Sequence, residues 1–156
     1  MKKYLKYIIG LIVLILFIVL LVFLLSRYDI MKCSSNSIKE DNYTIDSTYI
    51  IYYKKDIVKK VLIERKVTSK NKTILEFFEK NYKDEFKGYN KSYGGYTISS
   101  KTNNNTMILS VELDFNKINY DKFKQKNTYL KDYISNKQFK LDGVYTLFQL
   151  SKNSCK

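Results

Sequence analysis

The longest apolar run in the chain extends from Ile8 to Leu25 and holds no charged or hydroxyl side chain. Its 18 residues, at about 1.5 Å each, would make a helix of roughly 27 Å, close to the thickness of a bilayer core. The run is longer than the apolar part of a signal peptide, and no small-x-small cleavage site follows it. We therefore expect a single transmembrane signal-anchor helix, with residues 1–28 forming a cytoplasmic tip and the span.

Positive charges on the two sides of this run predict its orientation. Lys2, Lys3 and Lys6 precede the run, whereas Arg27 and Lys32 follow it. Because Lys and Arg are enriched on the cytoplasmic side of a span, Lys2, Lys3 and Lys6 form the topology signal. The expected location is the cell membrane, with a single pass, a cytoplasmic N-terminus and an extracytoplasmic C-terminal domain.

After a polar tether over residues 29–42, the hydrophobic pattern changes to the two-residue period of β-strands. Aromatic and β-branched residues alternate with polar ones over residues 43–53, and again over residues 60–68. The intervening Lys54-Lys55-Asp56 predicts a hairpin turn. A second predicted hairpin pairs residues 96–100 with residues 106–115.

Between the two hairpins the period becomes that of a helix, carried by Ile74, Phe77, Phe78, Tyr82 and Phe86. Thr73 and Glu76 are spaced as a capping box, and Gly88 is a candidate for the residue that ends the helix. Gly94-Gly95 then permits a bend into the second hairpin.

The last 40 residues carry a weaker pattern, in which Tyr129 to Ile134 have helical spacing. Asp142-Gly143 has two interpretations: a tight turn between short strands, or a helix start capped by Asp142. The helix is favoured because the preceding strand would be only three residues long. The expected fold class is α+β: an N-terminal transmembrane helix, then a domain over residues 43–156 with a four-stranded antiparallel sheet and two to three helices on one face.

The amino-acid composition limits the kinds of catalytic and metal site that the chain can form. The chain contains no His, Pro or Trp and only two Cys. Without imidazole there is no Ser-His or Cys-His pair and no His-containing zinc site, and two distant thiols cannot form a metal cluster. We therefore expect no enzyme, no catalytic residue, no metal site and no cofactor.

Cys33 and Cys155 would both lie outside the membrane, where disulfides persist. A bond between them would close a loop of about 120 residues, worth on the order of 4 to 5 kcal/mol in the chain-entropy treatment. Two unpaired cysteines, or pairing with another chain, remain open alternatives. A lipid anchor at Cys33 is disfavoured because Lys32 stands where a lipobox has a small residue.

Three further groups of polar residues are interpreted as structural. Ser69 and Lys72 match Ser-x-x-Lys, but the other motifs of penicillin-recognising enzymes are missing. Asp84-Glu85 and the pair Glu112 and Asp114 fit surface charge better than acid-base chemistry.

The chain is basic, with 28 Lys plus Arg against 15 Asp plus Glu and a formal net charge of +13. Residues 33–156 account for +9 of this charge, which favours attraction to anionic envelope polymers or lipid headgroups. AT-rich coding bias would also enrich Lys, Asn, Ile and Tyr. Because the lysines are scattered and many Tyr occupy strand positions, no nucleic-acid partner is expected.

The order of elements, with the alternating segment Thr106-Met107-Ile108-Leu109-Ser110-Val111-Glu112-Leu113-Asp114-Phe115, resembles the small bacterial YehR-like lipoproteins. The resemblance covers residues 43 to about 152. It implies an extracytoplasmic α+β domain, in a family without a settled function. The lipidated Cys of that family is missing, and the resemblance assigns no functional residue.

These observations favour a membrane-anchored bacterial envelope protein with a non-catalytic binding or scaffolding domain. The expected partners are the membrane itself and either anionic envelope polymers or another membrane protein. An accessory subunit of another membrane protein is the first alternative, and an envelope hydrolase is a weaker one.

Overall fold

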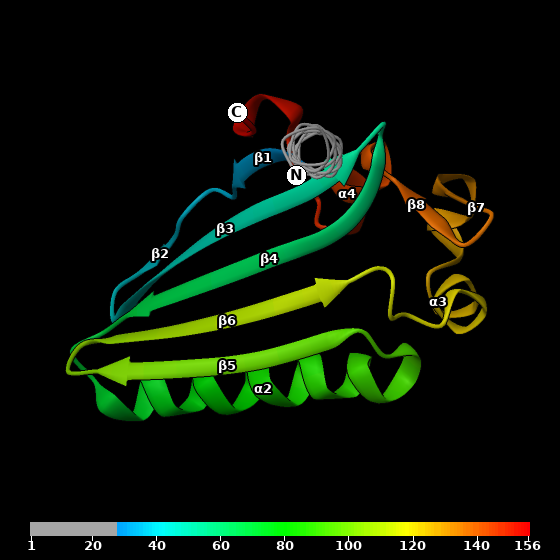
Figure 1. Ribbon diagram of the computed structural model, residues 1–156. Coiled ribbons are helices and arrows are strands. Elements are labelled where there is room, and N and C mark those ends of the chain that lie inside the picture. The colour runs from blue at the N-terminus through cyan, green and yellow to red at the C-terminus, as the bar shows by residue number, and fades with distance from the viewer. Residues whose placement is uncertain (1–27) are drawn as a thin grey trace, which may run out of the picture.

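Eight β-strands form one antiparallel sheet in the computed structural model, which describes residues 28–156 (Figure 1). The strands are β1 (Asp29–Ser34), β2 (Ile38–Glu40), β3 (Tyr43–Lys54), β4 (Ile57–Thr68), β5 (Tyr96–Asn103), β6 (Thr106–Asp114), β7 (Ile134–Ser135) and β8 (Gln138–Lys140). The main order is β1-β3-β4-β6-β5, with β2 beside β3 and β8 between β4 and β7. Both long hairpins expected from the alternating pattern are present, and β4 pairs with β6 to join them.

The predicted four-stranded sheet is wrong, because four more strands join it. β1 and β2 occupy the segment expected to be a tether, and β7 and β8 lie in the C-terminal part. β2, β7 and β8 have three residues or fewer, too few to show a two-residue period. β1 is held in the sheet by its pairing with β3, in a register that places Cys33 opposite Tyr49.

The predicted transmembrane helix is not part of the described fold. No helix within residues 28–156 is both long enough and apolar enough to span a bilayer. The apolar run 8–25 and the topology signal Lys2, Lys3 and Lys6 lie outside the described residues.

Helices pack against one face of the sheet and at one of its ends. They are α2 (Lys72–Tyr93), α3 (Tyr120–Lys126), α4 (Leu141–Leu147) and the 3₁₀ helices η1 (Thr128–Tyr133) and η2 (Lys152–Ser154). α2 runs along β5 in Figure 1 and packs on β5 and β6. The ring of Phe148, just after α4, contacts Tyr49 on β3, so the C-terminal part covers the same face from the other side.

α2 is longer than its predicted core, and its ends differ from those expected. Asn71 caps the helix by accepting a hydrogen bond from Thr73 N–H at 2.9 Å, so the predicted Thr73 and Glu76 box is wrong. The helix continues past Gly88 and ends at Gly94, whose φ is +75°. Tyr89 and Tyr93 extend the apolar spacing beyond Gly88, which explains the extra turns.

The Asp142-Gly143 segment is helical, as favoured, and β8 directly precedes it. Asp142 is not the cap, because the helix begins one residue earlier and Lys140 is the capping position. A Cβ on Gly143 would lie 2.6 Å from Tyr133 Cβ and 2.7 Å from the ring of Phe139. Glycine therefore lets α4 pack closely on η1 and β8.

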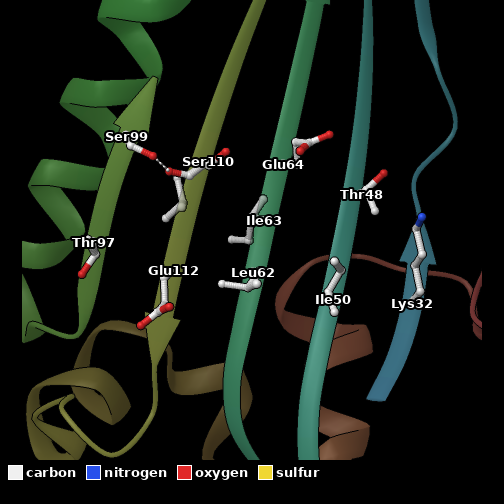
Figure 2. Close-up of a pocket in the computed structure, with 11 residues that line it drawn as sticks. Lys32, Thr48, Ile50, Leu62, Ile63, Glu64, Thr97, Ser99, Ser110 and Glu112 are labelled. Carbon is white, nitrogen blue, oxygen red and sulfur yellow. Dashed lines mark hydrogen bonds between the residues drawn. The ribbon is translucent and has the colours of Figure 1, made fainter. Parts of the chain in front are cut away.

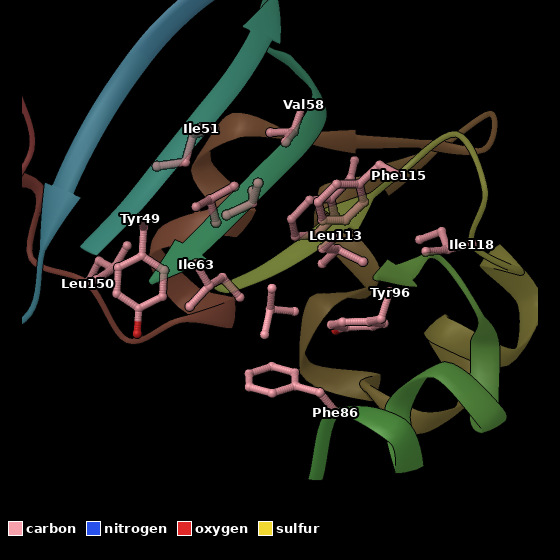
Figure 3. Close-up of a cluster of buried hydrophobic side chains, with 14 of the residues drawn as sticks. Tyr49, Ile51, Val58, Ile63, Phe86, Tyr96, Leu113, Phe115, Ile118 and Leu150 are labelled. Carbon is pink, nitrogen blue, oxygen red and sulfur yellow. The ribbon is translucent and has the colours of Figure 1, made fainter. Parts of the chain in front are cut away.

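The strands have one covered face and one open face. On the covered face, alternate residues of β3, β4 and β6 form the core, including Ile51, Val61, Leu109, Val111 and Leu113, each at most 1% exposed. Figure 3 shows members of this core between the sheet and the helices.

Candidate functional site

The layers that cover the sheet do not meet completely, and an aromatic cleft of about 320 Å³ remains between them. Its floor is the covered face of β3 and β4, formed by Tyr49, Ile63 and Arg65. One wall is the C-terminal half of α2, and the other is the segment Leu147-Phe148-Gln149. We name this feature the aromatic cleft.

Seven aromatic side chains line the aromatic cleft, and they belong to the sheet, α2, η1 and the C-terminal segment. They are Tyr49, Phe86, Tyr89, Tyr93, Tyr96, Tyr129 and Phe148. Several of the rings contact one another, with centroids 5.1 Å apart for Tyr49 and Phe148 and 5.8 Å apart for Phe86 and Tyr96. Figure 3 shows Tyr49 beside Ile63, and Phe86 near Tyr96 at the sheet-facing side of α2. These contacts fix the orientations of the rings.

Arg65 is the cation of the aromatic cleft and is held from two sides. Its guanidinium lies 4.6 Å from the ring centroid of Tyr82 and 5.1 Å from that of Phe86. One guanidinium nitrogen also pairs with Glu85 Oε2 at 3.2 Å. Stacking and ion pairing together orient a side chain that stands on the otherwise apolar face of β4.

Two tyrosines stand at the mouth of the aromatic cleft with their rings open to solvent. Tyr89 is 40% exposed and Tyr129 is 58% exposed. The Tyr89 hydroxyl donates to Glu85 Oε1 at 3.2 Å, and the Tyr129 hydroxyl donates to Asn127 Oδ1 at 3.4 Å. Large exposed rings on a soluble surface are frequent features of binding sites.

Burial raises the pKa of the Tyr89, Tyr93 and Tyr96 hydroxyls above the ordinary value. The negative charge of Glu85 adds to the rise in the pKa of Tyr89. The hydroxyls of Tyr93 and Tyr96 also share a hydrogen bond of 3.3 Å. The three hydroxyls are thus engaged within the protein, Tyr89 with Glu85 and Tyr93 with Tyr96.

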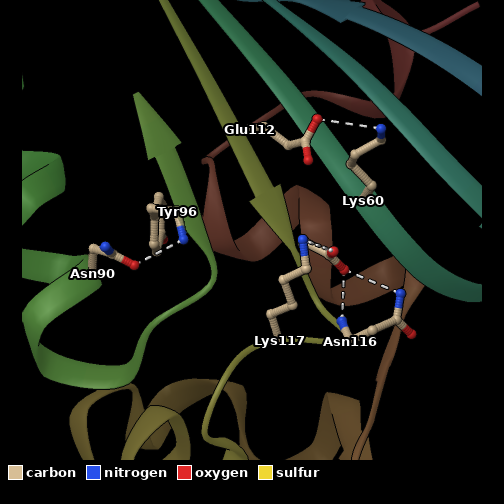
Figure 4. Close-up of polar contacts among 7 residues, drawn as sticks. Lys60, Asn90, Tyr96, Glu112, Asn116 and Lys117 are labelled. Atoms are coloured by element: carbon tan, nitrogen blue, oxygen red, sulfur yellow. Dashed lines mark hydrogen bonds and ion pairs between the residues drawn. The ribbon is translucent and has the colours of Figure 1, made fainter. Parts of the chain in front are cut away.

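The connection between α2 and β5 sets the positions of Tyr93 and Tyr96. Asn90 Oδ1 accepts from Tyr96 N–H at 3.0 Å, as Figure 4 shows, and its carbonyl accepts from Gly94 N–H at 2.8 Å. Gly95 has φ of +86°, and a Cβ there would lie 2.5 Å from Ile118. The Gly-Gly bend predicted from the sequence is thus a tight turn that places two rings of the aromatic cleft.

A disulfide between Cys33 and Cys155 holds the C-terminal segment against β1. Lys32 N–H donates to the Lys156 carbonyl at 2.9 Å, and Lys156 N–H donates to the Lys32 carbonyl at 2.8 Å. The intramolecular pairing, one of the alternatives left by the sequence, is therefore the one present in the structure. It restrains the segment that follows Phe148 and Gln149 in the wall of the aromatic cleft.

The open face of the sheet carries a different hollow, of about 440 Å³. Figure 2 shows its side chains standing on neighbouring strands, among them Thr48, Ile50, Leu62, Glu64 and Ser110. Its floor includes the aliphatic Ile50 and Leu62, and its polar lining includes both hydroxyl groups and the charged side chains of Lys32, Glu64 and Glu112. None of the side chains lining this hollow is aromatic.

Ser69 and Lys72, the residues of the Ser-x-x-Lys match, make structural contacts. Ser69 Oγ donates to the Asn42 carbonyl at 2.7 Å and accepts from Asn71 N–H at 3.0 Å, while Lys72 pairs with Glu76 at 3.7 Å. The Ser69 hydroxyl thus bonds to backbone groups on both sides.

The acidic residues that the sequence analysis interpreted as surface charge have separate partners in the structure. Glu112 pairs with Lys60 and Asp114 with Lys117, each at 3.3 Å (Figure 4). Asp84 is exposed, whereas Glu85 turns to Arg65. Within residues 28–156, no group of three His, Cys, Asp or Glu residues gathers where it could hold a metal ion.

Sequence reasoning missed the aromatic cleft, although one signal pointed to it. The apolar face of β4 reads Val61, Ile63 and Val67, and Arg65 interrupts it. A cation at a core-facing position needs a partner, which Glu85 supplies. No comparable local pattern in the sequence indicated that the C-terminal segment forms a wall of the aromatic cleft.

No model of a known protein family matches the chain, and no curated protein matches it. Among solved structures, the chain is similar to the NMR structure of the E. coli YehR protein, with 18% identity and a TM-score of 0.51, over 79% of this chain and 86% of that one. An NMR structure of a protein from Streptococcus pneumoniae TIGR4 is similar at 13% identity and a TM-score of 0.47, over 84% of this chain and 85% of that one. The weak YehR-like resemblance is thus confirmed as a likeness of fold.

Proposed function

We propose that this chain is a non-catalytic binding protein of the bacterial cell envelope and that the aromatic cleft is its ligand site. The observation that carries the proposal is the combination of a preformed hollow, seven lining rings and one oriented ion pair. Ligand sites are concave and mostly apolar, with a few fixed polar groups. The exposed lining of the aromatic cleft is more polar than this, but the cleft supplies seven aromatic anchors, whereas the larger hollow on the open face supplies none.

The proposed location outside the cytoplasm is supported by two observations. The apolar run 8–25 with its flanking lysines favours attachment at a membrane and export of the domain that follows. A bonded Cys33 and Cys155 pair is the form expected in an oxidising compartment.

The proposed partners are polymers of the envelope, bound in two ways. Residues 33–156 carry a formal +9, which attracts the domain to anionic polymers in a salt-dependent manner. Arg65 and Glu85 are the charged side chains among the described residues that line the aromatic cleft, and they oppose each other. Contacts in the aromatic cleft should therefore persist when salt screens the general attraction.

The test is retention of the purified full-length protein, in detergent, on isolated bacterial wall material as salt rises. A Tyr89→Ala/Tyr129→Ala variant removes the two exposed rings of the mouth. A Phe77→Ala/Tyr52→Ala variant is the matched control, since Phe77 is 59% exposed and neither ring lines the aromatic cleft.

We expect the wild-type protein and the control to keep a salt-resistant fraction that the Tyr89→Ala/Tyr129→Ala protein loses. Equal retention of the two double variants would contradict a role for the aromatic cleft. Failure of all three proteins to bind wall material, together with copurification of one defined membrane protein, would instead favour the accessory-subunit alternative.

A further inference from the structure

The aromatic cleft has no net charge to offer a ligand. Arg65 and Glu85 neutralise each other across 3.2 Å, in a domain that is otherwise rich in lysine. The ring faces of Tyr82 and Phe86 that could hold a ligand cation already hold the Arg65 guanidinium. A cationic ligand would meet this guanidinium, and an anionic ligand would meet Glu85, so a neutral ligand fits best.

The mouth of the aromatic cleft presents two exposed rings, of which Tyr89 has one face stacked on Tyr93 and the other available to a ligand. Tyr89 and Tyr129 are anchored through their hydroxyls to Glu85 and Asn127. The face of an aromatic ring is negative, and the C–H bonds on the flat side of a sugar ring are weakly positive. Such rings therefore stack on sugars without any formal charge on the ligand.

Planar polar groups stand beside the rings, as a hydroxyl-rich ligand requires. Asn127 and Gln149 line the aromatic cleft with amides, which both donate and accept hydrogen bonds. The Asn127 amide donates one N–H to the Phe123 carbonyl and accepts from the Tyr129 hydroxyl, so it offers a ligand its second N–H and its second lone pair. Arg65 has five N–H groups, of which the ion pair with Glu85 uses one nitrogen.

A second hollow continues from the aromatic cleft along the outside of α2. Its volume is about 450 Å³, and its further lining residues are Asp84, Gly88, Ser92 and Lys126, of which Asp84 and Lys126 carry opposite charges. The two hollows share Glu85, Tyr89, Tyr93 and Asn127 as lining residues. A ligand that fills both must be elongated and must cross Tyr89, which suits a chain of linked rings better than a single small molecule.

We infer that the ligand of the aromatic cleft is a neutral oligosaccharide, which lies across Tyr89 and stacks a second sugar ring on Tyr129. The inference rests on the proposed function and adds the chemical class of the ligand. Tyr89 and Tyr129 supply the stacking faces, and Asn127, Gln149 and Arg65 bond to the sugar hydroxyls.

Titration calorimetry of the full-length protein in detergent tests this inference with defined probes. The probes are the mono- and tetrasaccharides of N-acetylglucosamine and of glucose, each added at about 50 mM and about 500 mM salt. We expect at least one tetrasaccharide to bind about tenfold more tightly than its monosaccharide, with an affinity that salt does not change. Each of Tyr89→Ala and Tyr129→Ala should weaken that binding about tenfold, whereas Phe77→Ala should not.

Lack of binding by both tetrasaccharides, or binding that the Tyr89→Ala and Tyr129→Ala changes leave intact, would overturn the inference. Far-ultraviolet circular dichroism of each variant shows whether it is folded. If wall retention depends on the two tyrosines but neither sugar binds or competes, the ligand class is wrong and the proposed function stands. If wall retention does not depend on them, the proposed function itself fails.

Discussion

The two faces of the sheet are built from alternate residues of the same strands, yet the hollows on them are lined by different kinds of side chain. On β4, Ile63 and Arg65 face the helices, whereas Leu62 and Glu64 face the open side. The open-face hollow is the larger, at about 440 Å³ against about 320 Å³ for the aromatic cleft. The volumes of the two hollows therefore do not set the faces apart. The difference lies in the kinds of side chain that line each hollow.

The difference arises from what covers each face. α2 and the C-terminal segment bring rings from distant parts of the chain over Arg65, so the gap between them is lined by oriented aromatic groups. On the open face, Glu112 pairs with Lys60 of the next strand, and the side chains that line the hollow come from the strands alone. The aromatic cleft thus forms where two covering layers do not meet.

The largest effect should come from removing the bond that holds the C-terminal cover in place. Cys33→Ser/Cys155→Ser opens a link with a sequence separation of 122 residues, and we expect a loss of about 4 kcal/mol in the free energy of unfolding. Urea denaturation measures the loss, and the reduced wild-type protein is the control. An unchanged midpoint in both would show that the cover does not depend on this bond.

Two neighbouring residues on β6 allow the covered and open faces of the sheet to be compared by the cost of truncating a side chain on each. Leu109 is 0% exposed on the covered face, and Ile108 is half-buried on the open one. We expect Leu109→Ala to cost about 3 kcal/mol, because it leaves a cavity in the core, and Ile108→Ala to cost about 1 kcal/mol. Equal costs in thermal or urea unfolding would mean that the open face is covered in solution.

Two ion pairs give a finer comparison. Arg65 and Glu85 pair on the covered face at 3.2 Å, and Lys60 and Glu112 pair on the open face at 3.3 Å. Glu85→Gln leaves a stacked guanidinium without its carboxylate, for which we expect a cost of about 1 to 2 kcal/mol. Glu112→Gln should change the free energy of unfolding by about 0.5 kcal/mol or less, and the reverse order would contradict the account.

A last comparison concerns pH and the contact between α2 and β5. Lys83, with Ser100 and then Thr102, lowers the pKa of Glu79 from 4.5 to about 2. Because the folded-state pKa is the lower one, the stabilisation is complete above about pH 4.5 and is lost as the pH falls towards 2.

Glu79→Gln should therefore cost about 1 kcal/mol at neutral pH and less at low pH. Unfolding curves between these pH values measure the difference, and Glu76→Gln on the exposed side of α2 is the matched control. A pH dependence that is the same in wild-type and Glu79→Gln proteins would show that Glu79 does not anchor the helix.

Local patterns predicted the long elements because each carries several turns or pleats of periodic sequence. β3, β4, β5, β6 and the centre of α2 follow directly from alternation and helical spacing. The short strands β2, β7 and β8 have too few residues for such a signal, and their positions depend on pairing with distant strands.

The aromatic cleft was less accessible to sequence reasoning for the same reason. Arg65 marked a break in the β4 pattern, and Glu85 was visible only as one of two adjacent acids. The third component, Phe148, reaches Tyr49 from 99 positions along the chain. Local periodicity does not predict contacts between residues so far apart in the sequence. Which segments cover the sheet was therefore known only from the structure.

The most direct measurement is an amide chemical-shift map of the full-length protein in detergent, recorded while soluble fragments of bacterial wall polysaccharide are added. The account predicts shifts at Tyr89, Asn127 and Tyr129, around the mouth of the aromatic cleft, and none at Ile50 and Ser110 on the open face. Shifts confined to Ile50 and Ser110, or no shifts at saturating fragment concentration, would contradict the claim that the aromatic cleft binds the ligand.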